Sequence, residues 1–190
     1  YGGSGSFFVI GGLKYTTGSG GGNVLSAPPG VIAAGEDSTV GGVVGVSYEN
    51  PEIALRISAV YQAKQEMAHT SSTTYSGSKI TLKDTKSALP ASLTIAFQSG
   101  IAAVTLLFGS IHRALWSAAH ISFWSPSSLA GTNSYVQKTT WTDTTSLSLG
   151  IGRKLTDRWA MSISLNYEAP SEAAGTSLLS TTDGVRGITL

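Results

Sequence analysis

Apolar and polar residues alternate along several stretches of this 190-residue chain. The stretch 158–168 is the clearest example, because every second position there carries a large apolar side chain: Trp159, Met161, Ile163, Leu165 and Tyr167. The intervening positions carry mostly Ala, Ser and Asn, and the stretches 53–62, 93–98 and 147–152 follow the same rule. A period of two indicates β-strands. The pattern predicts a sheet with one apolar face and one face of small and polar side chains.

The most apolar stretch, LPASLTIAFQSGIAAVTLLFGSI at 89–111, is nearly long enough for a membrane-spanning helix. Such a helix needs about 20 apolar residues in succession. Here Pro90 and the pair Ser99-Gly100 interrupt the run, and residues 93–98 alternate between larger apolar side chains and smaller or polar ones. We therefore predict two antiparallel strands joined by a turn at Ser99-Gly100.

The same pattern, followed along the whole chain, predicts eight strands: 6–16, 39–49, 53–67, 89–99, 101–115, 141–154, 158–168 and 184–190. Short turns at 50–52, 99–100 and 156–157 alternate with long links near 17–38, 68–88, 116–140 and 169–183. Outer-membrane barrels have this asymmetry, with short periplasmic turns and long external loops. The predicted fold class is all-β, a transmembrane antiparallel up-and-down β-barrel.

The placement of aromatic residues agrees with a membrane barrel. Tyr48, Tyr61, Trp159 and Tyr167 fall near the ends of predicted strands. Membrane barrels carry rings of aromatic side chains at these positions, where the strands cross the two membrane interfaces. The alternative is a soluble β domain in which the same residues belong to an ordinary core.

Composition narrows the possible functions mainly by exclusion. Charged residues make up 12% of the chain and the net charge is +1, so the chain has no strong field to attract nucleic acid. The absence of cysteine excludes disulfides and thiolate metal sites. No phosphate-binding loop or metal-ligand pattern occurs, and no spacing singles out a Ser–His–acid set. We expect a protein that is not an enzyme and uses no cofactor or metal.

Several blocks of sequence, taken in order, resemble the C-terminal half of the FadL family, which are outer-membrane transporters of long-chain fatty acids and other hydrophobic compounds. The blocks are the stretch 89–111 quoted above, WTDTTSLSLGIGRKLTDRWAMSISLNYE at 141–168, TDGVRGITL at 182–190 and the strand pair EDSTVGGVVGVSYENPEIALRISAVYQ at 36–62. The likeness runs from about residue 36 to the end of the chain. The segment FFVIGGLKY at 7–15 is similar more loosely.

The resemblance implies a fourteen-stranded barrel with an N-terminal hatch in the lumen and lateral release of substrate through an opening in the wall. The hatch motif is not found here, and the last predicted strand, 184–190, is shorter than the roughly 9–11 residues that span a membrane. We expect residues 1–190 to be one partial barrel domain, internal or C-terminal in a larger barrel. The alternative is a complete eight-stranded barrel, whose interior the Ser, Ala and Gly of the polar face would fill poorly.

Four residues on the predicted lumen face are candidate ligand contacts: Arg56, Lys64, Phe108 and His112. The cation of Arg56 would attract a fatty-acid carboxylate, and Lys64 continues the same parity toward the external rim. A charge on this face must be hydrated or paired, so the alternative for Arg56 is an ion pair with a carboxylate of the wall or the hatch. Arg113 has the opposite parity and would face lipid, with its guanidinium among the headgroups.

The leading hypothesis is passive transport of hydrophobic compounds, namely long-chain fatty acids or similar lipids and aromatic hydrocarbons, across the bacterial outer membrane. Leu129 and the segment 169–179 could provide an external groove for first capture. The expected partners are outer-membrane lipid and a hydrophobic small molecule, without nucleic acid, and the barrel is expected to be a monomer. The second hypothesis is a barrel with a structural or surface-interaction role.

Overall fold

The computed structural model describes residues 5–24, 30–75, 78–81, 85–126, 134–138, 141–169 and 184–189. Strands make up most of these ranges. They are β1 (Ser6–Val24), β2 (Gly30–Asn50), β3 (Leu55–Gln62), β4 (Gln65–His69), β5 (Ser71–Tyr75), β6 (Ser78–Thr81), β7 (Thr85–Leu89), β8 (Ser92–Ala102), β9 (Thr105–Ala114), β10 (Ser122–Pro126), β11 (Ser134–Lys138), β12 (Thr144–Lys154), β13 (Ala160–Glu168) and β14 (Val185–Thr189). Two single-turn 3-10 helices, η1 (Pro51–Ile53) and η2 (Trp116–Ala118), lie between strands.

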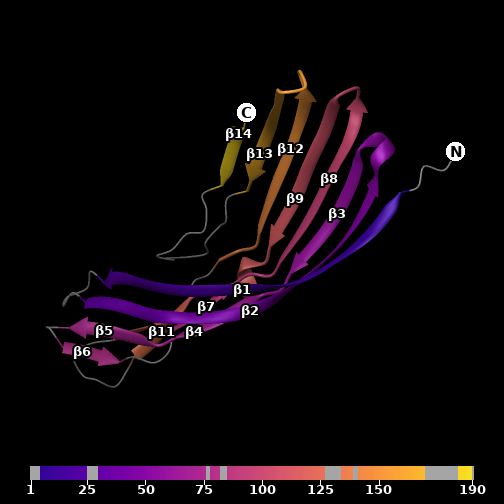
Figure 1. Cartoon of the computed structure of the whole chain (residues 1–190). Helices are drawn as coiled ribbons and strands as arrows, with labels where there is room; N and C mark the ends of the chain where they lie inside the picture. The colour runs from indigo at the N-terminus through magenta and orange to yellow at the C-terminus, as the bar shows by residue number, and fades with distance from the viewer. Residues whose placement is uncertain are drawn as a thin grey trace.

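Ten of these strands form one antiparallel sheet, the main sheet (Figure 1). Its order is β14-β13-β12-β9-β8-β3-β2-β5-β6, and β1 pairs with β2. The eight strands predicted from the sequence correspond to β1, β2, β3, β8, β9, β12, β13 and β14, which follow one another across the sheet in chain order. The predicted antiparallel up-and-down arrangement is therefore confirmed. Among the described residues the sheet is open, since no pairing joins β14 to β1.

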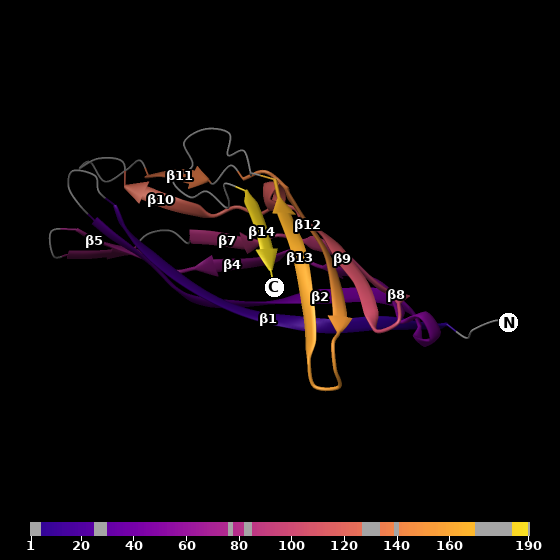
Figure 2. The ribbon, with the colours of Figure 1, turned by 90° about the horizontal axis from the view of Figure 1, so that it is seen from above.

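The other four strands form a small sheet of order β11-β10-β7-β4, which lies at the end of the molecule away from the short turns (Figures 1 and 2). Gln65 and His69 of β4 are 3% and 4% exposed, and Ser71 of the adjoining β5 is 0% exposed. His69 lies 2.8 Å through Nδ1 from the backbone oxygen of Gly35 in β2. The carboxylate of Asp37 accepts a hydrogen bond of 2.7 Å from the backbone of β4. These contacts join the small sheet to the first half of β2, which lies away from the short turns.

The hairpin predicted within 89–111 is present, but its turn lies further along the chain than the predicted Ser99-Gly100. β8 continues through Ala102, and residues 103 and 104 form the turn. At Gly100 a Cβ atom would lie 3.0 Å from the backbone oxygen of Ile53 in the neighbouring turn. The Ser-Gly pair resembles a turn signal because glycine is favoured in turns. Here the glycine instead permits close contact between strand and turn, beside a β-bulge.

Two further predictions about elements were wrong. The strand predicted at 53–67 is divided, because β3 ends at Gln62 and the chain enters the small sheet with β4. Three predicted long links also contain strands. The link 17–38 holds the second half of β1 and the first half of β2, the link 68–88 holds β5 to β7, and the link 116–140 holds β10 and β11. Those segments are rich in Ser, Thr and Gly, so alternate positions differ little in hydropathy and the period of two is weak. The link 169–183 lies outside the described residues except for its first position.

The strand register assigns the side chains of the main sheet to two faces, because residues paired across strands point to the same side. One row of successive partners is Tyr48, Ile57, Phe97, Gly109, Leu149, Leu165 and Ile188. Parallel rows two residues away contain further large apolar residues: Tyr61, Leu93, Ile95, Ile111, Leu147, Ile151, Ile163 and Tyr167. These rows together form the apolar face.

The apolar face is not covered by other parts of the described chain. Leu149 is 52% exposed, Leu165 59% and Trp159 at the end of the face 73%. No helix within the described ranges is long and apolar enough to cross a membrane. The alternation predicted from the sequence is thus confirmed as a two-faced sheet, with the large apolar side chains exposed on one face.

Candidate functional site

The opposite side of the main sheet carries small and polar side chains and is called the polar face. Its members include Glu49, Arg56, Ser58, Thr94, Gln98, Ser110, His112, Ser146, Ser148, Ser164, Asn166 and Glu168. Arg56, Phe108 and His112, three of the four candidate ligand contacts, lie on this face as predicted. Their roles toward a ligand stay predictions.

Arg56 begins one row of the polar face and is bound to Glu49 on the neighbouring strand. Its Nη2 lies 2.5 Å and its Nε 2.6 Å from Glu49 Oε1. The two residues are register partners across the β2–β3 connection, so the geometry of that short turn brings them together. Their side chains are 57% and 27% exposed. The structure therefore contains the alternative considered for Arg56, an ion pair with a carboxylate of the wall. This pair neutralises the charge of the arginine.

Phe108 lies in the same row as Arg56, separated from it by Gln98 of β8. The next position in the row is Gly150 of β12, where an added Cβ would lie 2.6 Å from the Phe108 ring. The glycine therefore makes room for the aromatic side chain. Toward the short turns, Phe108 borders a hollow of about 500 Å³ whose lining is mainly apolar and includes Leu106 and Gly152. Arg153 and Lys154 also border this hollow.

His112 belongs to a second row of the polar face, which crosses β8, β9, β12 and β13 through Thr94, His112, Ser146 and Glu168. The Thr94 hydroxyl oxygen lies 2.8 Å from Nδ1 of His112. The Ser146 hydroxyl donates to Oε2 of Glu168. All four residues are half-buried, so they remain accessible from the polar face. This set is called the polar row.

Lys64 does not lie with the other three candidates. It follows the end of β3, in the two-residue connection that leads into β4 of the small sheet. Its Nζ is 2.6 Å from Oε1 of Glu66, and the Glu66 side chain is 71% exposed. Lys64 is therefore placed at the end of the molecule that holds the small sheet, beyond the polar face.

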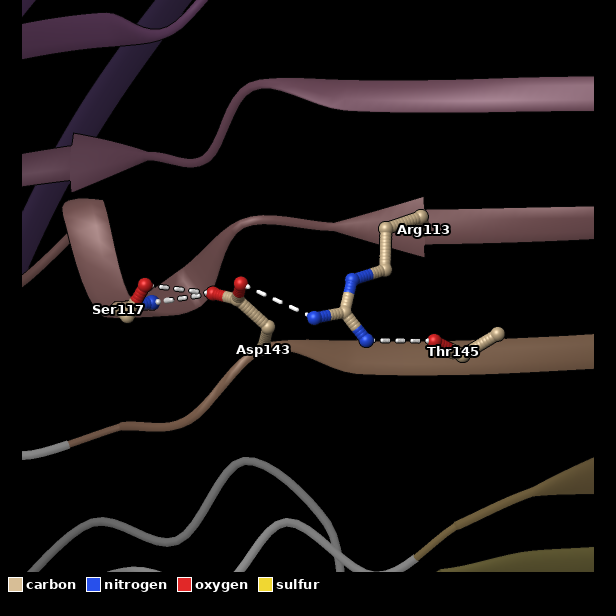
Figure 3. Close-up of polar contacts among 4 residues, drawn as sticks. All are labelled: Arg113, Ser117, Asp143 and Thr145. Carbon is tan, nitrogen blue, oxygen red and sulfur yellow. Dashed lines mark hydrogen bonds and ion pairs between the residues drawn. The ribbon is translucent and has the colours of Figure 1, made fainter.

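Arg113 lies on the apolar side of β9, as its parity predicted, and it has polar partners at the strand end (Figure 3). Its guanidinium donates to the Thr145 hydroxyl at 2.7 Å and lies 3.2 Å from the Asp143 carboxylate. Asp143 also accepts hydrogen bonds from the backbone and hydroxyl of Ser117, at 3.0 and 2.6 Å. The two Ser117 bonds, followed by Arg113, lower the pKa of Asp143 below its ordinary value.

Sequence reasoning missed Glu49, Thr94, Ser146 and Glu168. The first could have been found, because a tight turn at 51–54 makes residues 49 and 56 register partners. The polar row could not, since it depends on the register between strands far apart in the sequence. Within the described ranges, no three His, Asp or Glu side chains gather in a way that could hold a metal ion.

Two solved structures have a similar fold. One is the toluene transporter TbuX of Ralstonia pickettii, at 18% identity and a TM-score of 0.58, with 86% of this chain and 51% of that chain covered. The other is a deletion mutant of TodX, described as a monoaromatic hydrocarbon channel, at 18% identity and a TM-score of 0.53, with 92% and 52% covered. This chain thus spans about half the length of either structure. No family model and no curated protein matches the sequence. The chain thus shares the antiparallel β fold of these two transport proteins, and the resemblance noted in its sequence is confirmed at the level of the fold.

Proposed function

We propose that this protein mediates passive transport of hydrophobic compounds across the bacterial outer membrane. The observation that carries the proposal is the apolar face, whose large side chains lie on the outside of the sheet without protein cover. Water-exposed apolar patches larger than a few hundred Å² are rare on soluble monomers. Hydrocarbon is the solvent that suits such a face, since a membrane barrel directs alternate apolar residues toward lipid.

The length of β13 between its two aromatic ends supports a membrane setting. Trp159 and Tyr167 lie on the apolar side at its two ends, eight residues apart. Eight residues of strand measure about 27 Å, or about 20 Å along the membrane normal at a tilt near 40°. This is comparable to the roughly 25 Å apolar band of outer-membrane barrels, which aromatic rings border. In this setting the short turns face the periplasm and the small sheet lies outside the cell.

The barrel itself would be larger than the described sheet. Both β1 and β14 have one edge without a strand partner among the described residues. Residues 1–190 would then be a partial barrel domain whose two edges pair with further strands. A barrel wider than eight strands also leaves interior space, which the small side chains of the polar face require.

Transport in this scheme needs no energy source. Transfer of an apolar solute from water into a partly apolar lumen releases roughly 25 cal/mol for each Å² of apolar surface removed from water. Phe108 and the hollow beside it offer apolar contacts on the inner side of the wall. The position of Arg56 in the sequence suggested a binding site for a fatty-acid carboxylate. That role has less support here, because Glu49 already neutralises the arginine. Hydrocarbons and other uncharged solutes therefore suit the lumen better than carboxylates.

The test is uptake of radiolabelled toluene and oleate by cells that lack their own channel for such solutes and express the full-length protein. Faster uptake than in cells without the protein is expected, with a larger effect for toluene. Ser148→Trp narrows the polar face, and Leu149→Trp is a matched control on the apolar face one residue away. We expect the first to slow uptake several-fold and the second to leave it unchanged. Equal uptake with and without the protein would reject transport and leave the structural or surface-interaction role.

A further inference from the structure

Resting on the proposed function, we propose that the polar row binds the hydroxyl group of an otherwise apolar and uncharged compound, such as a phenol. The polar row consists of Thr94, His112, Ser146 and Glu168. It is placed on a face that otherwise carries mostly small side chains. The proposal therefore concerns which hydrophobic compounds the protein prefers.

The polar row has unused hydrogen-bonding capacity at two atoms. His112 is bound only through Nδ1, to Thr94, which leaves Nε2 without a protein partner in the described part of the chain. Glu168 accepts from Ser146 through Oε2, which leaves Oε1 without one there. Neither residue takes part in an ion pair within the described ranges. Polar groups on a partly apolar surface are expected to find partners, from water or from a ligand.

The two free atoms lie two strands apart with the short side chain of Ser146 between them. Neighbouring strands are about 4.8 Å apart, so the backbones that carry His112 and Glu168 are separated by roughly 10 Å. Both side chains rise from the same face and are long enough to approach one small group from opposite sides. In the proposed complex a single ligand oxygen lies between them and contacts both.

The chemistry of the two atoms selects a hydroxyl group. A carboxylate oxygen only accepts hydrogen bonds, whereas an imidazole Nε2 can donate when Thr94 donates to Nδ1. A hydroxyl supplies one hydrogen and accepts another, which matches both atoms at once. A ligand carboxylate would be repelled by Glu168. A ligand ammonium would find Glu168 but would be opposed by the N–H of His112.

The rest of the ligand has an apolar place beside the polar row. Phe108 precedes His112 by four residues on β9, which is about 13 Å of strand. The space between them on the polar face is bordered by small side chains, among them Ala96, Ser110 and Ser148. We place the single aromatic ring of the ligand over these residues, with its hydroxyl at the polar row and its other edge toward Phe108.

The test uses four ligands that share one ring and methyl group: toluene, p-cresol, 4-methylbenzoate and 4-methylbenzylamine. Their affinities for the purified full-length protein are measured by isothermal titration calorimetry at neutral pH. We expect p-cresol to bind at least about fivefold more tightly than toluene, the gain from one net hydrogen bond or slightly more. The carboxylate and the amine should bind more weakly than p-cresol.

Two variants assign the preference to the polar row. Glu168→Leu and His112→Leu should each reduce the ratio of p-cresol to toluene affinity about fivefold while leaving toluene binding within twofold. Glu168→Gln keeps the shape and should lower the ratio less, and it serves if Glu168→Leu does not fold. Asn166→Leu is the matched control on the same strand and face, and its ratio should equal that of the wild type.

The results separate this proposal from transport itself. Toluene binding without any preference for p-cresol would overturn the hydroxyl site and leave the transport proposal standing. Tighter binding of 4-methylbenzoate than of p-cresol would also overturn it, since a carboxylate would then be the favoured group. Binding of neither toluene nor p-cresol would count against both proposals.

Discussion

At the scale of single residues, four ion pairs join charged side chains of the described strands and turns. Arg56 pairs with Glu49, Arg113 with Asp143 and Lys154 with Asp157, at 2.5, 3.2 and 2.7 Å. Glu168 differs, since its partner is a neutral hydroxyl. The cation of Arg56 is offset by Glu49, whereas no cation pairs with Glu168 within the described ranges. This contrast explains why Glu168, and not Arg56, is expected to discriminate between ligands.

The Asp143 carboxylate should make the stability of the protein depend on pH. Its pKa is lowered in the folded state by the two Ser117 hydrogen bonds and then by Arg113. A lowered pKa means that the stabilising contribution is fully present above the unfolded value, near 3.9, and is lost as pH falls through the folded value. We expect about 1 kcal/mol or less, because Arg113 is 48% exposed and water screens the pair.

Asp143→Asn tests this effect, since the amide keeps the shape but cannot ionise. The melting temperature of the full-length protein is measured at pH 7 and pH 3 for both proteins. The variant should be less stable than the wild type at pH 7, and the difference should be smaller at pH 3. Asp157→Asn is the control, because that carboxylate is 97% exposed and its loss should matter little at either pH. A constant difference between Asp143→Asn and wild type at both pH values would contradict the prediction.

At the scale of elements, the sequence predicted strands where large apolar residues alternate with small ones, and it failed where that contrast is weak. The stretches 93–98 and 158–168 became β8 and β13 because their alternate positions face different surroundings. The small sheet was missed because its strands are only five residues long, too short to show a clear period of two. The turn predicted at Ser99-Gly100 was wrong because Gly100 lies within a strand, in close approach to the backbone of Ile53, and no local signal reports a contact across strands.

The true β8–β9 turn contains a residue in an unfavourable conformation. Val104 has a φ of 55°, in the left-handed region that costs a residue with a Cβ about 1–2 kcal/mol. Val104→Gly removes that cost. Glycine also makes the unfolded chain more flexible, which lowers the stability of the folded state by about 0.5–1 kcal/mol. We expect a net gain in stability of about 0.5–1 kcal/mol, measured by denaturant unfolding of the full-length protein in detergent.

Ala103→Gly is the matched control for this turn. Ala103 precedes Val104 and is not among the described residues with positive φ. Glycine at that position relieves no strain and should lower stability by about 0.5–1 kcal/mol. If both substitutions destabilise the protein equally, the left-handed conformation of Val104 does not limit the stability of the hairpin.

At the scale of the whole molecule, the end that holds the small sheet differs in packing from the end that holds the short turns. The small sheet, β5 and the first half of β2 have a buried interior that includes Gln65, His69 and Ser71. The other strands have an apolar face without cover and a polar face of small residues. Sequence periodicity could reveal the second part, because each strand repeats the same two-residue rule. It could not reveal the first, whose packing depends on contacts between segments such as His69 and Gly35.

Substitutions at two adjacent residues of β12 can distinguish a sheet that faces lipid from one that faces water. Leu149 lies near the middle of the strand on the apolar face, and Ser148 lies beside it on the polar face. An arginine on the lipid face near the bilayer centre costs about 2–4 kcal/mol, because its charge leaves water. We therefore expect Leu149→Arg to destabilise the full-length protein by that amount in bilayers and Ser148→Arg to cost much less, as measured by reversible denaturant unfolding.

A soluble protein with the same sheet would give the opposite order. Leu149 is 52% exposed, so an arginine there would meet water at little cost, whereas Ser148 would be the position facing the interior. The comparison is made within one strand and between neighbouring residues, so general effects of adding arginine cancel. Equal costs, or a larger cost at Ser148, would contradict the membrane setting and with it the basis of the transport proposal. A larger cost at Leu149 identifies hydrocarbon as the solvent of the apolar face.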